Sequence, residues 1–290
     1  MATTTEHRFD ADTAVVAQGG GIYTAVCSSD WGVPMGGPNG GYFAAILARA
    51  VLAEVDDAER RPRSLSVQFL RRPAYDVELR IAVTIERVGR TMSNVTVRAE
   101  QEGKLLALGM AIAALDQTVA LDYTTPAPVL PSPDDVPTLP VHPQMPPIAS
   151  RYLCKPCLGP AMFSGGDEAL TGGWIRLVDP RPFDALAAVA YLDAWLPAPF
   201  TMVSSPLIAP TLDYTVHLRA ALPVEELDPA AFLMLRMRST TSASGMFEED
   251  CEIWSPDGVL LAQSRQLALL APLRGQAATP ASADPAPSAS

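Results

Sequence analysis

Apolar and polar residues alternate along several stretches of this chain. Between residues 77 and 86, an apolar side chain occupies every second position and most of the others are charged or polar. A period of two predicts a strand with one buried face and one face in water. Val95 and Val97 continue the alternation, and residues 104–115 are apolar enough to predict a buried strand. The pattern therefore predicts a long antiparallel sheet over residues 77–115.

The segment before this sheet has the composition of a buried helix. From Asn39 to Ala53 the residues are apolar in nearly every position, and Arg49 is the only charge. A helix that is apolar all round lies inside a protein. Asn39 is a suitable N-cap, and Gly40 and Gly41 allow another backbone or a ligand to come close. Helix and sheet together predict an α+β unit in which the sheet wraps the helix.

The same order of elements occurs twice. The first copy ends in a Gly-x-Leu-Leu-Ala segment at residues 103–107 and the second at residues 258–262. A duplicated helix-plus-sheet unit can cover its open apolar surface with its twin. In the second copy we predict a strand at 171–177, a helix at 182–196, strands at 211–219, 232–239, 245–254 and 258–270, and a hairpin turn at Asp257-Gly258.

Nine prolines between residues 126 and 147 separate the copies and predict an extended segment, because proline disrupts helices and sheets. The predicted domains are an N-terminal unit at 1–118, a Pro-rich linker at 119–149, a C-terminal unit at 150–272 and a disordered tail at 273–290.

Composition and charge narrow the function. With 290 residues, 48% hydrophobic and 18% charged, the chain is that of a folded protein with room for two cores. A net charge of −11 argues against broad binding of nucleic acid. The polar N-terminus has no signal-peptide pattern, and the longest apolar run is far short of the ~20 residues that a membrane span needs. We expect a cytoplasmic protein with no membrane partner, and its sheet edges favour a homo-oligomer.

Cys154-Lys155-Pro156-Cys157 is a CxxC motif, which suggests zinc or redox chemistry. A zinc site needs about four ligands, and the remaining cysteines and histidines are isolated in the sequence. A redox CxxC begins a helix, whereas no helix is predicted here. We therefore expect no metal and no cofactor.

Three polar residues of the second copy stand where apolar ones would be ordinary. Asp193 falls near the C-terminal end of the predicted helix, where the helix dipole and burial would both raise the pKa of its carboxyl. Thr211 begins the next strand, and Gln266 shares a face of the last strand with small and apolar residues. Asp184, about 180° round the helix from Asp193, suits the helix start instead. Aligned positions in the first copy are Arg49, Ser64 and Ala111.

These segments resemble the acyl-CoA thioesterase II family, through residues 37–42, 192–193, 210–213 and 257–266. The resemblance implies a double hotdog: two antiparallel sheets, each wrapped round a central helix and fused in tandem. It also implies that Asp193, Thr211 and Gln266 hold a hydrolytic water. The chain departs from the family in a short loop between Asp193 and Thr211, and in Asn-Gly-Gly-Tyr where relatives carry Gly-Gly-Gln. Both departures would reshape the acyl pocket.

The implied substrate is a fatty acyl-CoA. A thioester carbonyl can be attacked by water if a carboxylate takes the water's proton and N–H groups stabilise the oxyanion. Asp193 suits the base, and Asn39, Gly40 and Gly41 at a helix start are candidate substrate-binding residues. The densest basic group, in and after a predicted charged turn at 56–63, could hold CoA phosphates or be a solvated turn; it comprises Arg60, Arg61, Arg63, Arg71 and Arg72.

Other functions are also compatible with parts of this sequence. A serine hydrolase is disfavoured because the chain has no Gly-x-Ser-x-Gly motif. An enoyl-CoA hydratase or dehydratase of the same fold would use a histidine beside the carboxylate, and no histidine falls on a predicted helix. A non-catalytic acyl-CoA binding protein would bind the thioester without cleaving it.

Overall fold

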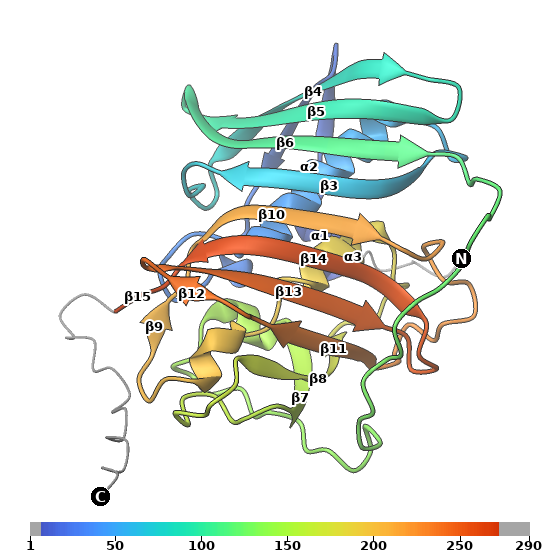
Figure 1. The fold of residues 1–290 in the computed structure, drawn as a ribbon. Helices are drawn as coiled ribbons and strands as arrows, with labels where there is room; N and C mark the ends of the chain where they lie inside the picture. The colour runs from blue at the N-terminus through green and yellow to red at the C-terminus, as the bar shows by residue number, and fades with distance from the viewer. Residues whose placement is uncertain (1–6, 273–290) are drawn as a thin grey trace, which may run out of the picture.

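The computed structural model describes residues 7–272, and most of their strands form one antiparallel sheet of 13 strands (Figure 1). The strand order is β1-β2-β4-β5-β6-β3-β10-β14-β13-β11-β8-β7, with β12 paired to β13. The strands of the first copy are β1 (Val16–Gly19), β2 (Ile22–Val26), β3 (Arg61–Phe69), β4 (Glu78–Val88), β5 (Met92–Gln101) and β6 (Lys104–Ala114). Those of the second are β7 (Tyr152–Leu158), β8 (Leu170–Leu177), β10 (Thr211–Leu218), β11 (Leu233–Arg238), β12 (Ser242–Ala243), β13 (Met246–Trp254) and β14 (Leu260–Leu269).

Two central helices lie inside this curved sheet and pack against each other: α2 (Gly40–Val55) and α3 (Ala185–Tyr191). Ten of the sixteen residues of α2 are buried, as its apolar composition predicts. Asn39 caps α2 as predicted, because its Oδ1 accepts a hydrogen bond from the Tyr42 N–H at 2.9 Å. The expected double hotdog is therefore confirmed.

The predicted helix at 182–196 is longer than α3, which ends at Tyr191. Asp184 caps its start, with Oδ1 accepting from the Ala187 N–H at 2.8 Å. At the other end, the backbone carbonyl of Asp193 accepts a hydrogen bond from Asn39 of the other repeat. Pro197 also keeps the residue before it away from helical geometry. The predicted helix was too long because apolar periodicity shows only neighbours in sequence. It shows neither the hydrogen bond from Asn39 of the first repeat nor the turn that follows Tyr191.

The two sheets join edge to edge through β3 and β10, which pair antiparallel from Asp213 opposite Gln68 to His217 opposite Ser64. Figure 1 shows this pair at the centre of the sheet. Strand β3 begins at Arg61, so the predicted charged turn at 56–63 ends three residues too late. Its arginines alternate with Pro62 and Ser64, so this end of the strand lacks the alternation of apolar and polar residues that predicts a strand.

The Pro-rich segment has no helix or strand from residue 115 to 146, as predicted, but it is packed against the second repeat. Val136 is 7% exposed and lies in a cluster with Trp174, Met234 and Trp254 on the outer face of the sheet. The Trp174 Nε1–H donates to the backbone carbonyl of Pro131 at 2.9 Å. The segment therefore covers apolar surface rather than only spanning between the repeats.

Outside the large sheet and the two central helices lie three 3₁₀ helices and one small sheet. They are η1 (Ser29–Trp31), η2 (Pro147–Ser150), η3 (Ala198–Thr201), and β9 (Leu207–Ile208) paired with β15 (Ala271–Pro272). The tail predicted at 273–290 lies outside the described residues. None of the helices in residues 7–272, of which α2 is the longest, has the length and apolarity needed to cross a membrane.

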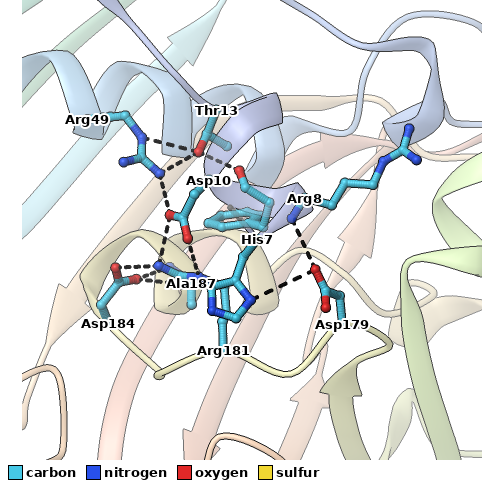
Figure 2. A network of polar contacts seen from close by, with 10 residues as sticks. His7, Arg8, Asp10, Thr13, Arg49, Asp179, Arg181, Asp184 and Ala187 are labelled. Carbon is cyan, nitrogen blue, oxygen red and sulfur yellow. Dashed lines mark hydrogen bonds and ion pairs between the residues drawn. The ribbon is translucent and has the colours of Figure 1, made fainter. Parts of the chain in front are cut away.

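A short N-terminal helix, α1 (Arg8–Asp12), ties the two central helices together (Figure 2). Its Asp10 accepts hydrogen bonds from Arg49 of α2 at 2.8 Å and from Arg181 at 3.0 Å. Arg181, only 8% exposed, also donates to the cap residue Asp184 at 2.8 Å and 3.0 Å. Burial raises the pKa of Asp10, but the two arginines outweigh it and hold the pKa below its ordinary value. Sequence periodicity did not predict α1, because a helix of five residues has too few turns to show it.

Replacing Arg181 with leucine should lower the free energy of unfolding by ~3 kcal/mol, because it leaves two partly buried carboxylates without their shared partner. The matched control is Arg265→Leu, which removes an exposed two-point ion pair to Asp250 with distances of 2.7 Å and 2.9 Å. That loss should stay below ~1 kcal/mol. Urea titration measures both values, and equal losses would contradict a special role for the buried arginine.

Candidate functional site

The C-terminal end of α3 meets the N-terminal end of α2, and Asp193 lies at that meeting point. The Gly41 N–H donates to Asp193 Oδ2 at 2.7 Å, and Asn39 Nδ2 donates to the same oxygen at 2.9 Å. Asn39 Nδ2 also donates to the Asp193 backbone carbonyl at 2.8 Å. A carboxylate of the second repeat is thus held on the helix start of the first, where the helix dipole favours negative charge.

The two glycines at the start of α2 make this contact sterically possible. A Cβ on Gly41 would lie 2.8 Å from Asp193 Cβ and 3.0 Å from the backbone carbonyl oxygen of Ala190. A Cβ on Gly40 would lie 3.0 Å from Asp193 Oδ2 and 3.4 Å from the Phe69 ring. Both glycines therefore allow the helices and the carboxylate to approach closely.

Burial raises the pKa of Asp193 to about 6, against the hydrogen bonds from Gly41, Asn39, Gln266 and Gly40, which lower it. The sequence predicted an upward shift from burial and from the dipole of its own helix. The structure adds the N-terminus of α2, whose donors act in the opposite direction. The residue as a whole is partly exposed, whereas its carboxyl group is buried enough for its pKa to rise.

The structure brings the other two predicted catalytic residues to the same place. Thr211 opens β10, and its Oγ1 donates to Gln266 Oε1 at 2.9 Å. Gln266 lies on β14 and is 4% exposed. Hydrogen bonding from Gln266 also lowers the pKa of Asp193, which links the amide to the carboxylate as well as to the threonine. The three side chains lie far apart in sequence and form one polar group.

A fourth polar residue, Glu249, lies in this group and was missed by the sequence analysis. It lies on β13 directly opposite Gln266 in the strand register and is 1% exposed. Its Oε1 accepts from Gln266 Nε2 at 2.8 Å, and its Oε2 accepts from the Ala198 N–H at 2.5 Å. Burial raises the pKa of Glu249 to about 8, and the charge of Asp193 adds to the shift.

A signal for Glu249 was present in the sequence. It alternates with Phe247, Cys251 and Ile253, all buried, so period-two counting places it on the inner face. With its neighbours Glu248 and Asp250, Glu249 forms a run of three acids, and such runs are usually exposed to solvent. The run therefore obscured the alternation of buried and exposed positions.

The five arginines proposed for CoA phosphates do not form one cluster. Strand β3 is nine residues long, so roughly 26 Å separates its ends, at the usual rise per residue. Arg60, Arg61 and Arg63 lie at its start and pair with Asp57 or Asp116. Arg71 and Arg72 follow its other end, the one near the start of α2, and both are exposed.

Arg72 lies beside the segment that leads into α2, and Arg71 precedes it in the chain. A Cβ on Gly37, three residues before Gly40, would lie 3.2 Å from the Arg72 Cβ. The Arg71 guanidinium donates to the Leu105 carbonyl at 2.8 Å and that of Arg72 to the Met35 carbonyl at 2.5 Å. These bonds leave both guanidinium groups uncompensated by a carboxylate partner among residues 7–272.

The CxxC motif lies in strand β7, where positions three apart face opposite sides. Both thiols are free. Burial raises the pKa of Cys154 to about 12 and that of Cys157 as well, which disfavours the reactive thiolate. Within residues 7–272, no three His, Cys, Asp or Glu side chains converge in a group that could hold a metal ion.

Comparison with known families gives two consecutive matches. Residues 28–115 match the model of the acyl-CoA thioesterase N-terminal domain, and residues 133–270 match that of the acyl-CoA thioesterase C-terminal domain. Each match covers one helix-plus-sheet unit of the structure. None of the curated proteins compared with the chain matches it.

Solved structures share the whole architecture. A conserved protein of unknown function with a hot dog fold from Alicyclobacillus acidocaldarius is 28% identical, with a TM-score of 0.80 over 93% of this chain and 100% of that one. A putative thioesterase II from Thermobifida fusca YX is 27% identical, with a TM-score of 0.76 over 91% of this chain and 97% of that one. Acyl-CoA thioesterase II TesB2 from Mycobacterium marinum, 19% identical, has the same fold with a TM-score of 0.71 over 93% of this chain and 99% of that one. The chain therefore belongs to the acyl-CoA thioesterase family and carries both of its domains in tandem.

Proposed function

We propose that this protein hydrolyses fatty acyl-CoA thioesters to the free acid and CoA, with a water held by Asp193, Thr211 and Gln266. The observation that carries the proposal is the meeting of these three side chains at the start of α2. Membership of the thioesterase family supports the reaction class. The carboxyl group of Asp193, with its pKa raised towards neutrality by burial, supports the choice of base.

The two oxygens of Asp193 have different tasks in this mechanism. Oδ2 accepts from Gly41 and Asn39, so it anchors the side chain. Oδ1 takes a proton from the water as the water oxygen forms a bond to the thioester carbonyl carbon. When the tetrahedral intermediate collapses, the C–S bond breaks and the proton returns from Oδ1 to the departing thiolate sulfur. The carboxylate is regenerated, and no covalent enzyme intermediate is needed.

Thr211 and Gln266 orient the water, and α2 serves the carbonyl oxygen. In this structure Asn39 and the Gly41 N–H are engaged with the base. The Gly40 N–H also lowers the pKa of Asp193, so all three candidate substrate-binding residues act on the base, and the dipole of α2 is what would stabilise the developing oxyanion. Asn39 and Gly41 would act on the substrate indirectly, by holding Asp193.

Arg71 and Arg72 are the proposed contacts for CoA phosphates. They are exposed, they stand at the end of β3 nearest Gly37, and neither is neutralised by an ion pair among the described residues. Arginine forks suit phosphate oxygens. Arg60, Arg61 and Arg63 at the far end of the strand are not part of this proposal.

Replacing Asp193 with asparagine should lower kcat by about 10²- to 10⁴-fold, the usual contribution of a general base. Thiol release from acyl-CoA substrates of increasing chain length measures the effect. The matched control is Asp184→Asn at the other end of the same helix, because asparagine is an equally good N-cap. An Asp193→Asn protein as active as wild type would show that another group is the base.

The rate should fall as the pH drops below about 6. Protonation of Asp193, whose pKa is raised to about 6, removes the acceptor for the water's proton. Activity is thus retained above this pKa and lost below it, and the residual rate of Asp193→Asn should lack this acid limb. A kcat/KM profile from pH 4.5 to 7 that stays flat for wild type is the contrary result.

Replacing Asn39 with alanine should move the acid limb to higher pH, because Asn39 is one of the donors that lower the pKa of Asp193. Asp184→Ala removes the N-cap of the other helix and is the matched control. The lost cap alone costs about 1 kcal/mol of stability in each variant, and Asp184→Ala costs more because it also removes a carboxylate partner of the buried Arg181; urea titration can verify both losses. The limb should move only in Asn39→Ala, and an equal movement in both variants would point to a general loosening of the helix pair.

A further inference from the structure

Glu249 is a buried acid that the mechanism above does not use. It is 1% exposed and alternates along β13 with the buried Phe247 and Cys251. Burying a carboxyl group is costly unless it is hydrogen-bonded. Both of its oxygens have a donor: Gln266 Nε2 at 2.8 Å and the Ala198 N–H at 2.5 Å. A side chain this costly, bonded directly to a proposed catalytic residue, is the strongest unassigned feature of the molecule.

The orientation of the Gln266 amide depends on its partners. The two ends of an amide group are nearly identical in shape, so packing alone does not choose between them. In the structure, Gln266 Oε1 accepts from Thr211 Oγ1, and Nε2 donates to Glu249 Oε1. Hydrogen bonding from the same side chain lowers the pKa of Asp193. The NH₂ end thus faces Glu249, the carbonyl end faces the threonine, and the side chain as a whole acts on the pKa of Asp193.

We propose that Glu249 is a positioning residue: it fixes the orientation of the Gln266 amide, so that Gln266 presents its NH₂ end to Asp193 and its carbonyl end to Thr211. The effect of this orientation on catalysis rests on the function proposed above. The orientation of the Gln266 amide itself does not depend on that function. Glu249 touches neither substrate nor water in this role and acts only through Gln266.

The backbone of η3 makes the effect depend on the charge of Glu249. The Ala198 N–H must have an acceptor, so one oxygen of residue 249 always faces it. In the carboxylate, the other oxygen is also an acceptor and requires the NH₂ end of Gln266. In the neutral acid, or in a glutamine at this position, the other end carries a donor instead. That donor requires the carbonyl end of Gln266, which turns the amide over and leaves Asp193 facing an oxygen.

The surroundings of Glu249 place this change near neutral pH. The titratable groups that act on it are Asp193 after α3, the Cys251 thiol on the same face of β13, and Glu248, the preceding residue, whose side chain points to the opposite face. Asp193 and Glu248 disfavour its negative charge, as burial does, and together they raise the pKa of Glu249 to about 8. Above this pH the amide should have the orientation of the structure and below it the reverse, which withdraws the Gln266 donor from Asp193 and shifts the acid limb of the rate above the pKa that Asp193 has in this structure.

The test follows the Gln266 amide directly. In protein labelled with ¹⁵N in glutamine side chains and ¹³C in glutamate carboxyls, the Gln266 NH₂ signals, identified by their loss in Gln266→Ala, should shift between pH 7 and 9. Their midpoint should be that of the Glu249 carboxyl. In Glu249→Gln they should be insensitive to pH over this range. The titration of wild type needs no variant, so a Glu249→Gln protein that fails to fold does not prevent the test.

Kinetics supply the second readout. Wild-type kcat should rise about tenfold between pH 7 and 9 as Glu249 ionises, and Glu249→Gln should stay at the lower level. In a Gln266→Ala background, Glu249→Gln should change nothing, because the residue acts only through that amide. The control is Glu252→Gln, which changes an acid of β13 that contacts Gln263 on β14 at 3.4 Å and is otherwise paired with Arg236. It should keep the wild-type profile.

The outcomes separate the two proposals. Gln266 signals that ignore both pH and the Glu249→Gln change would overturn the positioning role, even if the protein releases thiol. A loss of activity from Glu249→Gln that is equal at every pH, or that persists without Gln266, would overturn it too. If the signals titrate as described but no acyl-CoA is cleaved, the positioning role stands and the thioesterase proposal fails.

Discussion

The structure depends on one contact between its repeats: the carboxylate of Asp193 lying on the N-terminus of α2. An anion at a helix start is stabilised by unpaired N–H groups and by the helix dipole. Here the anion comes from the end of α3, so the attraction also fixes how the two central helices meet. Because Gly41 has no Cβ, the helices come close enough for the bond to form. Packing of the helices and placement of the acid are therefore a single constraint.

This constraint explains why the duplicated chain has one candidate site rather than two. The start of α3 is closed by its own cap residue Asp184, which is bound to the buried Arg181. The start of α2 is capped by Asn39, whose amide nitrogen remains available and binds Asp193. The first repeat supplies the electropositive helix end, and the second supplies the acid. Neither repeat alone therefore contains both the helix end and the acid that the candidate site combines.

Much of the architecture could be predicted from the sequence because its signals are local. The apolar run at 39–53 and the alternation after residue 77 depend only on neighbouring residues, and both elements are present as α2 and β4. Helix α1 and the early end of α3 depend on partners more than a hundred residues away, such as Arg181 for Asp10. Local periodicity contains no information about such pairs.

The residues of the candidate site also divide into those that the sequence could reveal and those that only the structure reveals. Asp193, Thr211 and Gln266 were found because family resemblance records residues that lie far apart in the chain. Glu249 belongs to no segment of that resemblance, and only the strand register places it opposite Gln266.

The segment between Asp193 and Thr211, which was expected to be shorter than in the family, contains η3 and β9. Its residue Ala198 is the backbone partner of Glu249, so this segment and the unexpected buried acid are in direct contact. Thr211, Gln266, Glu249 and the Ala198 N–H form one chain of hydrogen bonds in a largely buried setting. Each member of such a chain determines whether the next is donor or acceptor, so the loop backbone and the water-binding side chains act as a single unit.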